Sequence, residues 1–225
     1  GAVGEAWASR QPILVIATDI PARLRRPGVW RGVLHEATDQ AAMFEPVVKE
    51  AVRVRSADEL GPAVERAAAV AMTPPRRPVY VEVPTDLLAA EWQEQPGLSP
   101  PVGSLPVADA MARATTMAER SRSPLIWAGG GALQADAGAA LARLAERLVA
   151  PVILTYSARG LLPPGHPCLV EAPPHVPEIG ALWDDADLVI AIGTDFDGMM
   201  TQGWKQPQPP HLIAVNLDPA DAAKN

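Results

Sequence analysis

Short apolar runs recur along the chain, and each run is bounded by glycine, proline or polar turn residues. In the second half the runs are continuous, which is typical of strands buried on both faces of a parallel sheet. They predict strands at residues 124–128, 151–155, 187–192 and 211–216. In the first half, similar runs predict strands at residues 12–17 and 78–83.

Apolar residues at helical spacing lie between these predicted strands. They predict helices at residues 57–72, 107–120, 134–148 and 178–184. Strands that alternate with helices indicate an α/β fold with a parallel sheet, here a doubly wound, Rossmann-like domain in the second half. Such sheets bind ligands at the carboxyl ends of their strands.

Proline and glycine divide the chain into two parts. Residues 93–106 contain four prolines and two glycines, a composition typical of an extended linker. We therefore predict a first domain at residues 1–92, a linker at 93–106 and a second domain at 107–225. The chain has no initiator methionine, and residues 1–8 resemble the middle or end of a helix without a capping residue. We expect a piece of a longer protein.

Composition narrows the classes of function. The 225 residues are 48% hydrophobic and 20% charged, an ordinary balance for a folded protein. The net charge of −7 leaves no basic excess for a nucleic-acid surface. Cys168 is the only cysteine, which excludes a disulfide framework and a thiolate metal set. No apolar run approaches the roughly 20 residues that cross a bilayer, and no signal peptide is visible. We expect no nucleic-acid partner, no membrane association and a cytoplasmic location.

Two glycine-containing loops follow predicted strands. Gly129-Gly130-Gly131 stands between a strand and a helix, the context of a turn that approaches a phosphate. Gly193 and Asp195 follow a later strand, where a carboxylate could bind a ribose hydroxyl. A nucleotide site at these five residues is one interpretation. A tight turn and a polar loop rim without a ligand are the alternative, because the spaced glycines of a dinucleotide fingerprint are missing.

A short polar stretch in the first part contains His35, Glu36, Asp39 and Gln40. A histidine beside carboxylates can have a pKa suited to proton transfer. Asp39 can instead cap a short helix that begins at Gln40, and residue chemistry alone favours the cap. The histidines of the chain lack ligand spacing, so we expect no metal site within it.

Several stretches in order resemble the acetolactate-synthase-like family of thiamine-diphosphate enzymes. His35-Glu36-Ala37-Thr38-Asp39-Gln40 resembles the Gln-Glu…Asp-Gln stretch of its pyrimidine-binding domain. Arg77-Pro78-Val79 with Pro84-Thr85-Asp86 resembles the Gly-Pro-Val…Pro-x-Asp strand of that domain. The second part is similar to the family's central domain at residues 124–131, 150–160, 164–167, 186–197 and 218–225. The resemblance implies the C-terminal part of the pyrimidine-binding α/β domain, followed by the Rossmann-like central domain.

This resemblance implies a decarboxylase or carboligase that uses thiamine diphosphate and Mg²⁺, acts on a small 2-oxo acid and forms a homodimer or homotetramer. The family's catalytic glutamate would lie upstream of Gly1, and the motif that holds Mg²⁺ and the diphosphate would lie beyond Asn225. The chain alone is then expected to be inactive, with no catalytic or metal-binding residue of its own. His35, Glu36 and Gln40 match positions near the substrate or cofactor.

The same resemblance argues against flavin. Relatives that hold FAD against the central domain have arginines where this chain has Glu45 and Asp195. Exchanging a cation for an anion near a diphosphate should repel it. We therefore expect no tight binding of FAD.

Two alternatives remain open on the sequence. The second part could be a standalone Rossmann-like module that binds a nucleotide or acyl-CoA without catalysis. The chain could also belong to a degenerate homologue that is kept for assembly.

Overall fold

The computed structural model describes residues 1–93 and 107–222. Apart from Gln93, the predicted linker therefore lies outside the described residues. The chain divides into two compact units, residues 1–104 and 105–225, and each has its own parallel sheet. Among the described residues, no helix is long and apolar enough to span a membrane.

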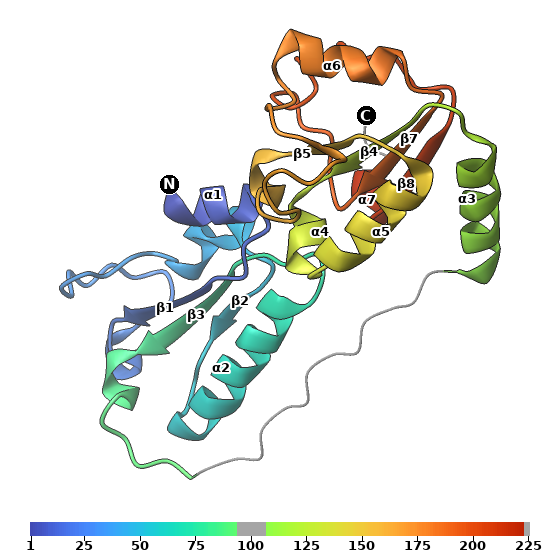
Figure 1. Cartoon of the computed structure of the whole chain (residues 1–225). Coiled ribbons are helices and arrows are strands. Elements are labelled where there is room, and N and C mark those ends of the chain that lie inside the picture. The colour runs from blue at the N-terminus through green and yellow to red at the C-terminus, as the bar shows by residue number, and fades with distance from the viewer. Residues whose placement is uncertain (94–106, 223–225) are drawn as a thin grey trace. The chain divides into compact units, whose positions relative to one another are not determined.

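The first unit is built on a three-stranded parallel sheet (Figure 1). Strand β3 (Val79–Pro84) lies between β1 (Leu14–Asp19) and β2 (Ala51–Arg53). Helix α1 (Ala2–Ala8) precedes β1 in the sequence, and α2 (Ala57–Met72) connects β2 to β3. Short 3-10 turns occur at Ala22–Leu24, Ala41–Met43, Glu45–Val47 and Thr85–Leu87.

Strand β3 is apolar on one face and carries polar groups on the other. Its valines pack toward helix α2, where Ala67 and Ala71 are buried in the same cluster. On the opposite face, the ring of Tyr80 stacks on Phe44 with ring centroids 4.4 Å apart. Glu82 shares this face with Tyr80 because side chains alternate along a strand.

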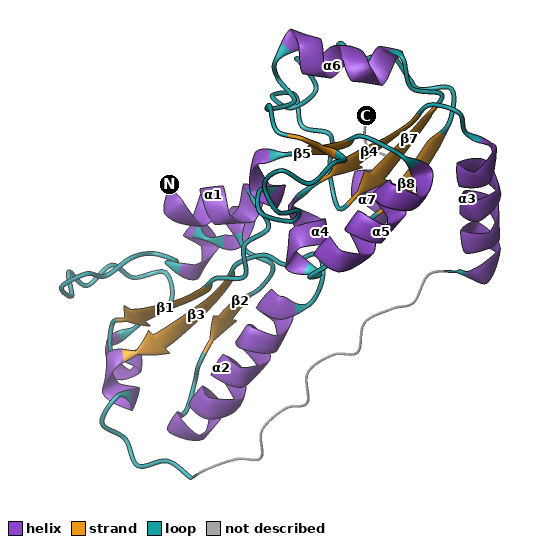
Figure 2. Ribbon diagram, viewed as in Figure 1, coloured by secondary structure: helices purple, strands orange, loops and turns teal. Residues whose placement is uncertain are grey.

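The second unit contains a five-stranded sheet in the order β6-β5-β4-β7-β8, with all neighbours parallel (Figure 2). Its strands are β4 (Pro124–Ala128), β5 (Val152–Leu154), β6 (Leu169–Val170), β7 (Leu188–Ile192) and β8 (Leu212–Val215). Its helices are α3 (Ala108–Arg120), α4 (Gly130–Gln134), α5 (Gly138–Leu148), α6 (Pro177–Asp184) and α7 (Pro219–Ala222). A 3-10 turn, Tyr156–Ala158, follows β5.

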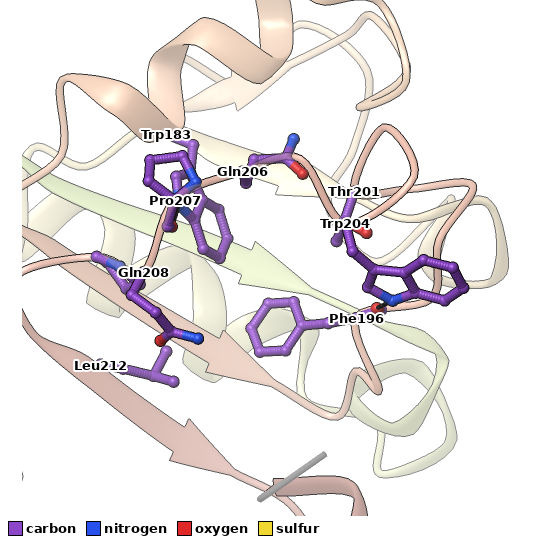
Figure 3. A pocket seen from close by; sticks show the side chains of 9 residues that line it. Trp183, Phe196, Thr201, Trp204, Gln206, Pro207, Gln208 and Leu212 are labelled. Atoms are coloured by element: carbon purple, nitrogen blue, oxygen red, sulfur yellow. Dashed lines mark hydrogen bonds between the residues drawn. The ribbon is translucent and has the colours of Figure 1, made fainter. Parts of the chain in front are cut away.

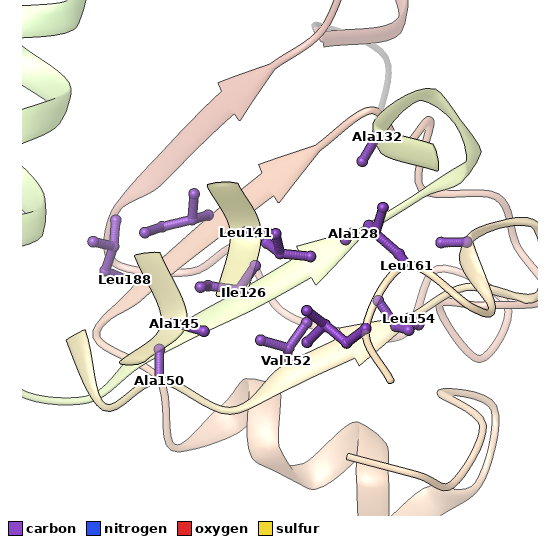
Figure 4. Close-up of a cluster of buried hydrophobic side chains, with 13 residues drawn as sticks. Ile126, Ala128, Ala132, Leu141, Ala145, Ala150, Val152, Leu154, Leu161 and Leu188 are labelled. Atoms are coloured by element: carbon purple, nitrogen blue, oxygen red, sulfur yellow. The ribbon is translucent and has the colours of Figure 1, made fainter. Parts of the chain in front are cut away.

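Both faces of this sheet are buried, which explains the continuous apolar runs. On one face, Ile126 and Val152 lie in a cluster with Leu141 of α5 (Figure 4). On the other face, Trp183 of α6 packs edge-on against Trp127 with ring centroids 5.3 Å apart. Helices on both faces of a parallel sheet confirm the predicted doubly wound architecture.

The predicted strands and most helices agree with the structure to within two residues at each end. The pattern does not predict β2 and β6. Strand β2 has three residues, one of them Arg53, and β6 has two, so neither gives a clear apolar run. Strand β5 is as short as β2 but lies within the longer apolar run at 151–155. The prediction of one helix at 134–148 is wrong. The structure has α4 and α5 there, separated at residues 135–137, where Asp136 has a φ of 51°. A left-handed residue cannot continue a right-handed helix.

Candidate functional site

The carboxyl ends of β4 and β7 meet at one edge of the second sheet. The strand register pairs Ala128 with Ile192, so the loops that follow begin side by side. The N–H of Gly129 donates to the carbonyl oxygen of Ile192 at 2.8 Å, and the N–H of Gly131 donates to that of Gly193 at 2.9 Å. The structure thus brings the two predicted glycine loops together.

The space beside these glycines is filled by the protein itself. A Cβ atom on Gly131 would lie only 2.8 Å from the Cα of Gly193. One on Gly129 would overlap the Gly193 carbonyl, and one on Gly130 would meet the turn after β5 at 2.9 Å. The glycines are therefore required for close approach of neighbouring loops. A role for them in nucleotide binding stays a prediction.

The loop after β7 is fixed by its own polar groups. The side-chain amide of Asn216 donates to the carbonyl oxygen of Thr194 at 2.8 Å, which ties this loop to the end of β8. Asp197 accepts hydrogen bonds from the N–H groups of Met199 and Met200 at 2.9 and 3.1 Å. Asp197 therefore acts in a local turn. Asp195 is half-buried at the same edge, and its proposed contact with a nucleotide stays a prediction.

An aromatic cavity of about 170 Å³ lies between α6 and the 201–209 loop (Figure 3). Its walls include Trp183, Phe196 and Trp204, and no charged side chain is among the described residues that line it. Gln206 also lines the cavity, and both polar atoms of its amide are buried without a hydrogen-bond partner. The cavity is close to the roughly 150 Å³ that holds one benzene molecule. It could admit one uncharged ring.

Three polar side chains are buried on one face of the first sheet. Asp19 is the last residue of β1, and Tyr80 and Glu82 lie on β3. The Tyr80 hydroxyl donates to Glu82 Oε2 at 3.2 Å. The β2–β3 register places Arg53 opposite Glu82, and Arg53 Nε lies 3.5 Å from Glu82 Oε1.

Arginines balance the two buried carboxyl groups. Arg25 forms an ion pair with Asp19, and Arg53, besides facing Glu82, forms an ion pair with Asp39. Both arginines are partly exposed. Buried charges are tolerated when they are paired and hydrogen-bonded, so the cluster is a connected network of partners.

Burial governs the proton affinities in this network. It raises the pKa of Glu82, the neighbouring Asp19 adds to the rise, and Arg53 opposes it. Burial also raises the pKa of Tyr80 to about 12. Tyr80 therefore remains a hydroxyl donor at neutral pH, and Glu82 keeps its proton to a higher pH than an exposed glutamate does.

The three predicted site residues of the first unit, His35, Glu36 and Gln40, lie in different environments. His35 is exposed and has a φ of 63°. The Glu36 carboxylate accepts hydrogen bonds from the N–H groups of Arg31 and Val33 at 3.1 and 3.0 Å, so it fixes its own loop. Only Gln40 joins the buried network, through the Tyr80 hydroxyl.

Asp39 accepts the hydrogen bond expected of a cap, although the N-cap position of the turn is Gln40, whose own side chain makes no cap hydrogen bond. Asp39 Oδ1 accepts a hydrogen bond from the N–H of Ala42 at 2.9 Å, at the start of the 3-10 turn Ala41–Met43. The turn begins one residue later than predicted. Asp39 also pairs with Arg53, which links this turn to β2.

Sequence reasoning missed Asp19, Tyr80 and Glu82 as a group. The available signal is a glutamate inside the apolar run Val79–Val83, because an unpaired charge in a buried strand is costly. Their grouping depends on parallel pairing of segments more than 60 residues apart, which places Ala17 opposite Glu82. Local patterns do not contain that information.

The donor set of the described residues does not fit a bound diphosphate with its cation. Mg²⁺ requires oxygen ligands grouped at one point. Within residues 1–93 and 107–222, no group of three or more His, Cys, Asp or Glu side chains could hold a metal ion. No chemical step through thiamine diphosphate is therefore assigned to residues of this chain.

Comparisons with known proteins match both units. The chain is 36% identical to the probable 2-ketoarginine decarboxylase of Pseudomonas aeruginosa, over 97% of this chain and 39% of the relative. It is 25% identical to the probable acetolactate synthase large subunit of Methanocaldococcus jannaschii, over 99% and 39%. It is 27% identical to the acetolactate synthase isozyme 1 large subunit of Escherichia coli, over 99% and 40%. The chain thus spans about two fifths of the length of these relatives.

A family model describes the second unit. The model of the central domain of thiamine pyrophosphate enzymes matches residues 111–225, which include all five strands of the second sheet. The parallel α/β architecture agrees with this match. The chain belongs to the thiamine pyrophosphate (thiamine diphosphate) enzyme family and contains the central domain of that family.

Proposed function

We propose that the chain is part of a thiamine-diphosphate-dependent lyase or transferase that decarboxylates a 2-oxo acid, with or without a following carboligation. The observation that supports this most is the continuous similarity to a relative named as a decarboxylase, which runs through both units at 36% identity. If the second unit were a standalone binding module, we would expect similarity to these relatives in the second unit alone.

The proposed substrate is a small 2-oxo acid, and 2-ketoarginine is the first to test because it appears in the name of the relative that is 36% identical. The proposed cofactors are thiamine diphosphate and Mg²⁺. We place their ligands outside residues 1–93 and 107–222, among which no suitable donor cluster is found. On this proposal, residues 1–92 complete the pyrimidine-binding domain and residues 107–225 form the central domain.

We further propose a homodimer or homotetramer that binds no FAD. The absence of flavin is supported by Glu45, which is exposed, and by Asp195 at the carboxyl edge of the second sheet. Both are anionic at positions where the family resemblance implies arginines in members that bind flavin, so each would repel a diphosphate.

The test uses the longer polypeptide that contains this chain, supplied with thiamine diphosphate and Mg²⁺. Release of CO₂ from 2-ketoarginine and from pyruvate is measured, with each cofactor omitted in turn. Release of CO₂ from either acid that requires thiamine diphosphate supports the proposal. A folded protein that binds the cofactor mixture but releases no CO₂ from any of a panel of 2-oxo acids contradicts it.

A further inference from the structure

The segment of residues 20–40 lies over the carboxyl edge of the first sheet with little regular structure. Its one helical turn among the described residues is Ala22–Leu24. Its apolar residues Val29, Trp30 and Leu34 are 54%, 65% and 79% exposed. Ile20, at the start of the segment, is 4% exposed. Beyond Ile20, burial of these large apolar side chains contributes little to holding the segment, which contains His35.

Polar contacts hold the segment at both ends. At its start, Arg25 pairs with Asp19, and the N–H of Ala22 donates to Asp86 at 2.9 Å. At its end, the Gln40 amide donates to the carbonyl oxygen of Thr18 at 3.0 Å. The anchors are residues at the carboxyl ends of β1 and β3.

The Gln40 amide also begins a chain of hydrogen bonds into the interior. It donates to the Tyr80 hydroxyl at 2.7 Å, and that hydroxyl donates to Glu82 at 3.2 Å. Tyr80 is fully buried, so its hydroxyl depends on these two partners. Because the Tyr80 hydroxyl donates its hydrogen to Glu82, its lone pairs are free to accept the hydrogen bond from the Gln40 amide. Glu82 thereby orients the hydroxyl toward Gln40.

Every element packed around Glu82 contributes a charged or titratable group. Asp19 belongs to β1, Arg53 to β2, Tyr80 to β3 and Arg25 to the segment itself. Asp39 faces the network through its ion pair with Arg53. These are the groups whose charges decide how Glu82 responds to pH.

We propose that Glu82 is a positioning residue, which acts through Tyr80 and Gln40 to hold the 20–40 segment, and with it His35, at the carboxyl edge of the first sheet. The link from His35 to a substrate rests on the proposed function. The positioning itself is a property of residues 14–84 and does not depend on that function.

Opening of the 20–40 segment should depend on pH. Burial and Asp19 raise the pKa of Glu82 while the segment is closed. When the segment opens and water reaches Glu82, the pKa falls toward its ordinary value. A group with a raised pKa in the closed state favours closure below its open-state pKa, and this contribution is lost as pH rises through the closed-state pKa. Opening should therefore become easier as pH rises.

The test is amide hydrogen exchange of residues 22–39 in the 225-residue chain, without cofactor, from pH 5 to pH 8 and corrected for intrinsic exchange. In the unmodified chain we expect segment opening to increase with pH. Glu82→Gln keeps an acceptor for Tyr80 and removes the titration, so its opening should not change with pH. Tyr80→Phe and Gln40→Ala each break the chain of hydrogen bonds. About fivefold faster exchange is expected from Tyr80→Phe. A larger increase is expected from Gln40→Ala, which also removes the hydrogen bond to the carbonyl oxygen of Thr18.

The matched control is Tyr156→Phe, which removes a hydroxyl bonded to His175 at 2.9 Å in the second unit and should leave residues 22–39 unaffected. Exchange that accelerates equally in α2 would mean general destabilisation and would overturn the proposal. The proposal would also be overturned if opening of the segment in the unmodified chain did not depend on pH. This measurement requires no variant, so it does not depend on whether a variant folds. Because no activity is measured, failure here is distinguishable from failure of the proposed decarboxylation.

Discussion

The carboxylate of Asp187 holds together the segments that lead into β4 and β7. It stands directly before β7 and accepts hydrogen bonds from the Ser121 hydroxyl and from the N–H groups of Arg122 and Ser123, the latter two at 2.8 and 3.1 Å. The Ser121 hydrogen bond, followed by that of Arg122, lowers the pKa of Asp187. Asp187 thus connects the end of α3 to the sheet.

Replacing Asp187 by alanine is expected to lower the denaturation midpoint, because three donors lose their acceptor. A lowered folded-state pKa gives stability that is present above the unfolded-state pKa and is lost as pH falls through the folded-state pKa. The deficit of Asp187→Ala should therefore shrink as pH falls below about 4. Thermal denaturation at pH 7 and pH 3 measures it, with Asp185→Ala as the matched control. Equal deficits at both pH values would count against this account.

Gly131 tests whether the glycine loop is required by packing. A Cβ there would approach the Gly193 backbone, which cannot move as a flexible side chain does. We expect Gly131→Ala to reduce the free energy of unfolding by about 1–3 kcal/mol. Urea denaturation gives the value. An unchanged midpoint would show that the loops have room for a side chain, as a ligand site requires.

At the scale of elements, helix α2 provides the opposite case. A Cβ on Gly61 would meet only Trp92, at an ordinary 3.9 Å. Gly61→Ala should therefore stabilise the protein by about 0.5–1 kcal/mol, since glycine costs conformational entropy inside a helix. The same urea experiment as for Gly131→Ala gives the comparison, and a loss of stability would contradict the described packing of α2.

Elements that lie within uninterrupted apolar runs could be predicted from the sequence, and short elements outside such runs could not. The runs that form β4 and β7 are apolar throughout because both faces are covered, so their period and length suffice. Strand β2 has three residues, and its position depends on pairing with β3. Of the site, the sequence contains the local motif of His35, Glu36 and Gln40, and its role near a substrate or cofactor stays a prediction. The network around Glu82 could not be predicted, because parallel pairing assembles it from distant segments.

At the scale of the whole molecule, the sequence similarity covers both units although the family model covers the second. On the proposed function, the ligands of the cofactor and its cation lie outside the described residues of the two units. On the proposed function, the chain provides the central domain and the C-terminal part of the pyrimidine-binding domain.

The flavin prediction belongs to this scale, because it concerns the assembled protein. The longer polypeptide should not quench the fluorescence of added FAD, since Glu45 and Asp195 would repel its diphosphate. Binding of thiamine diphosphate with Mg²⁺ by the same sample is the control that shows the protein to be folded. Stoichiometric retention of FAD through gel filtration would refute the charge argument.

The most direct test of the central claim is calorimetric titration of thiamine diphosphate with Mg²⁺ into two proteins, the 225-residue chain and the longer polypeptide that contains it. Our account predicts saturable binding by the longer polypeptide and none by the 225-residue chain. Binding by the short chain would place the cofactor site within residues 1–225. No binding by a folded longer polypeptide would contradict the assignment of a thiamine-diphosphate-dependent enzyme.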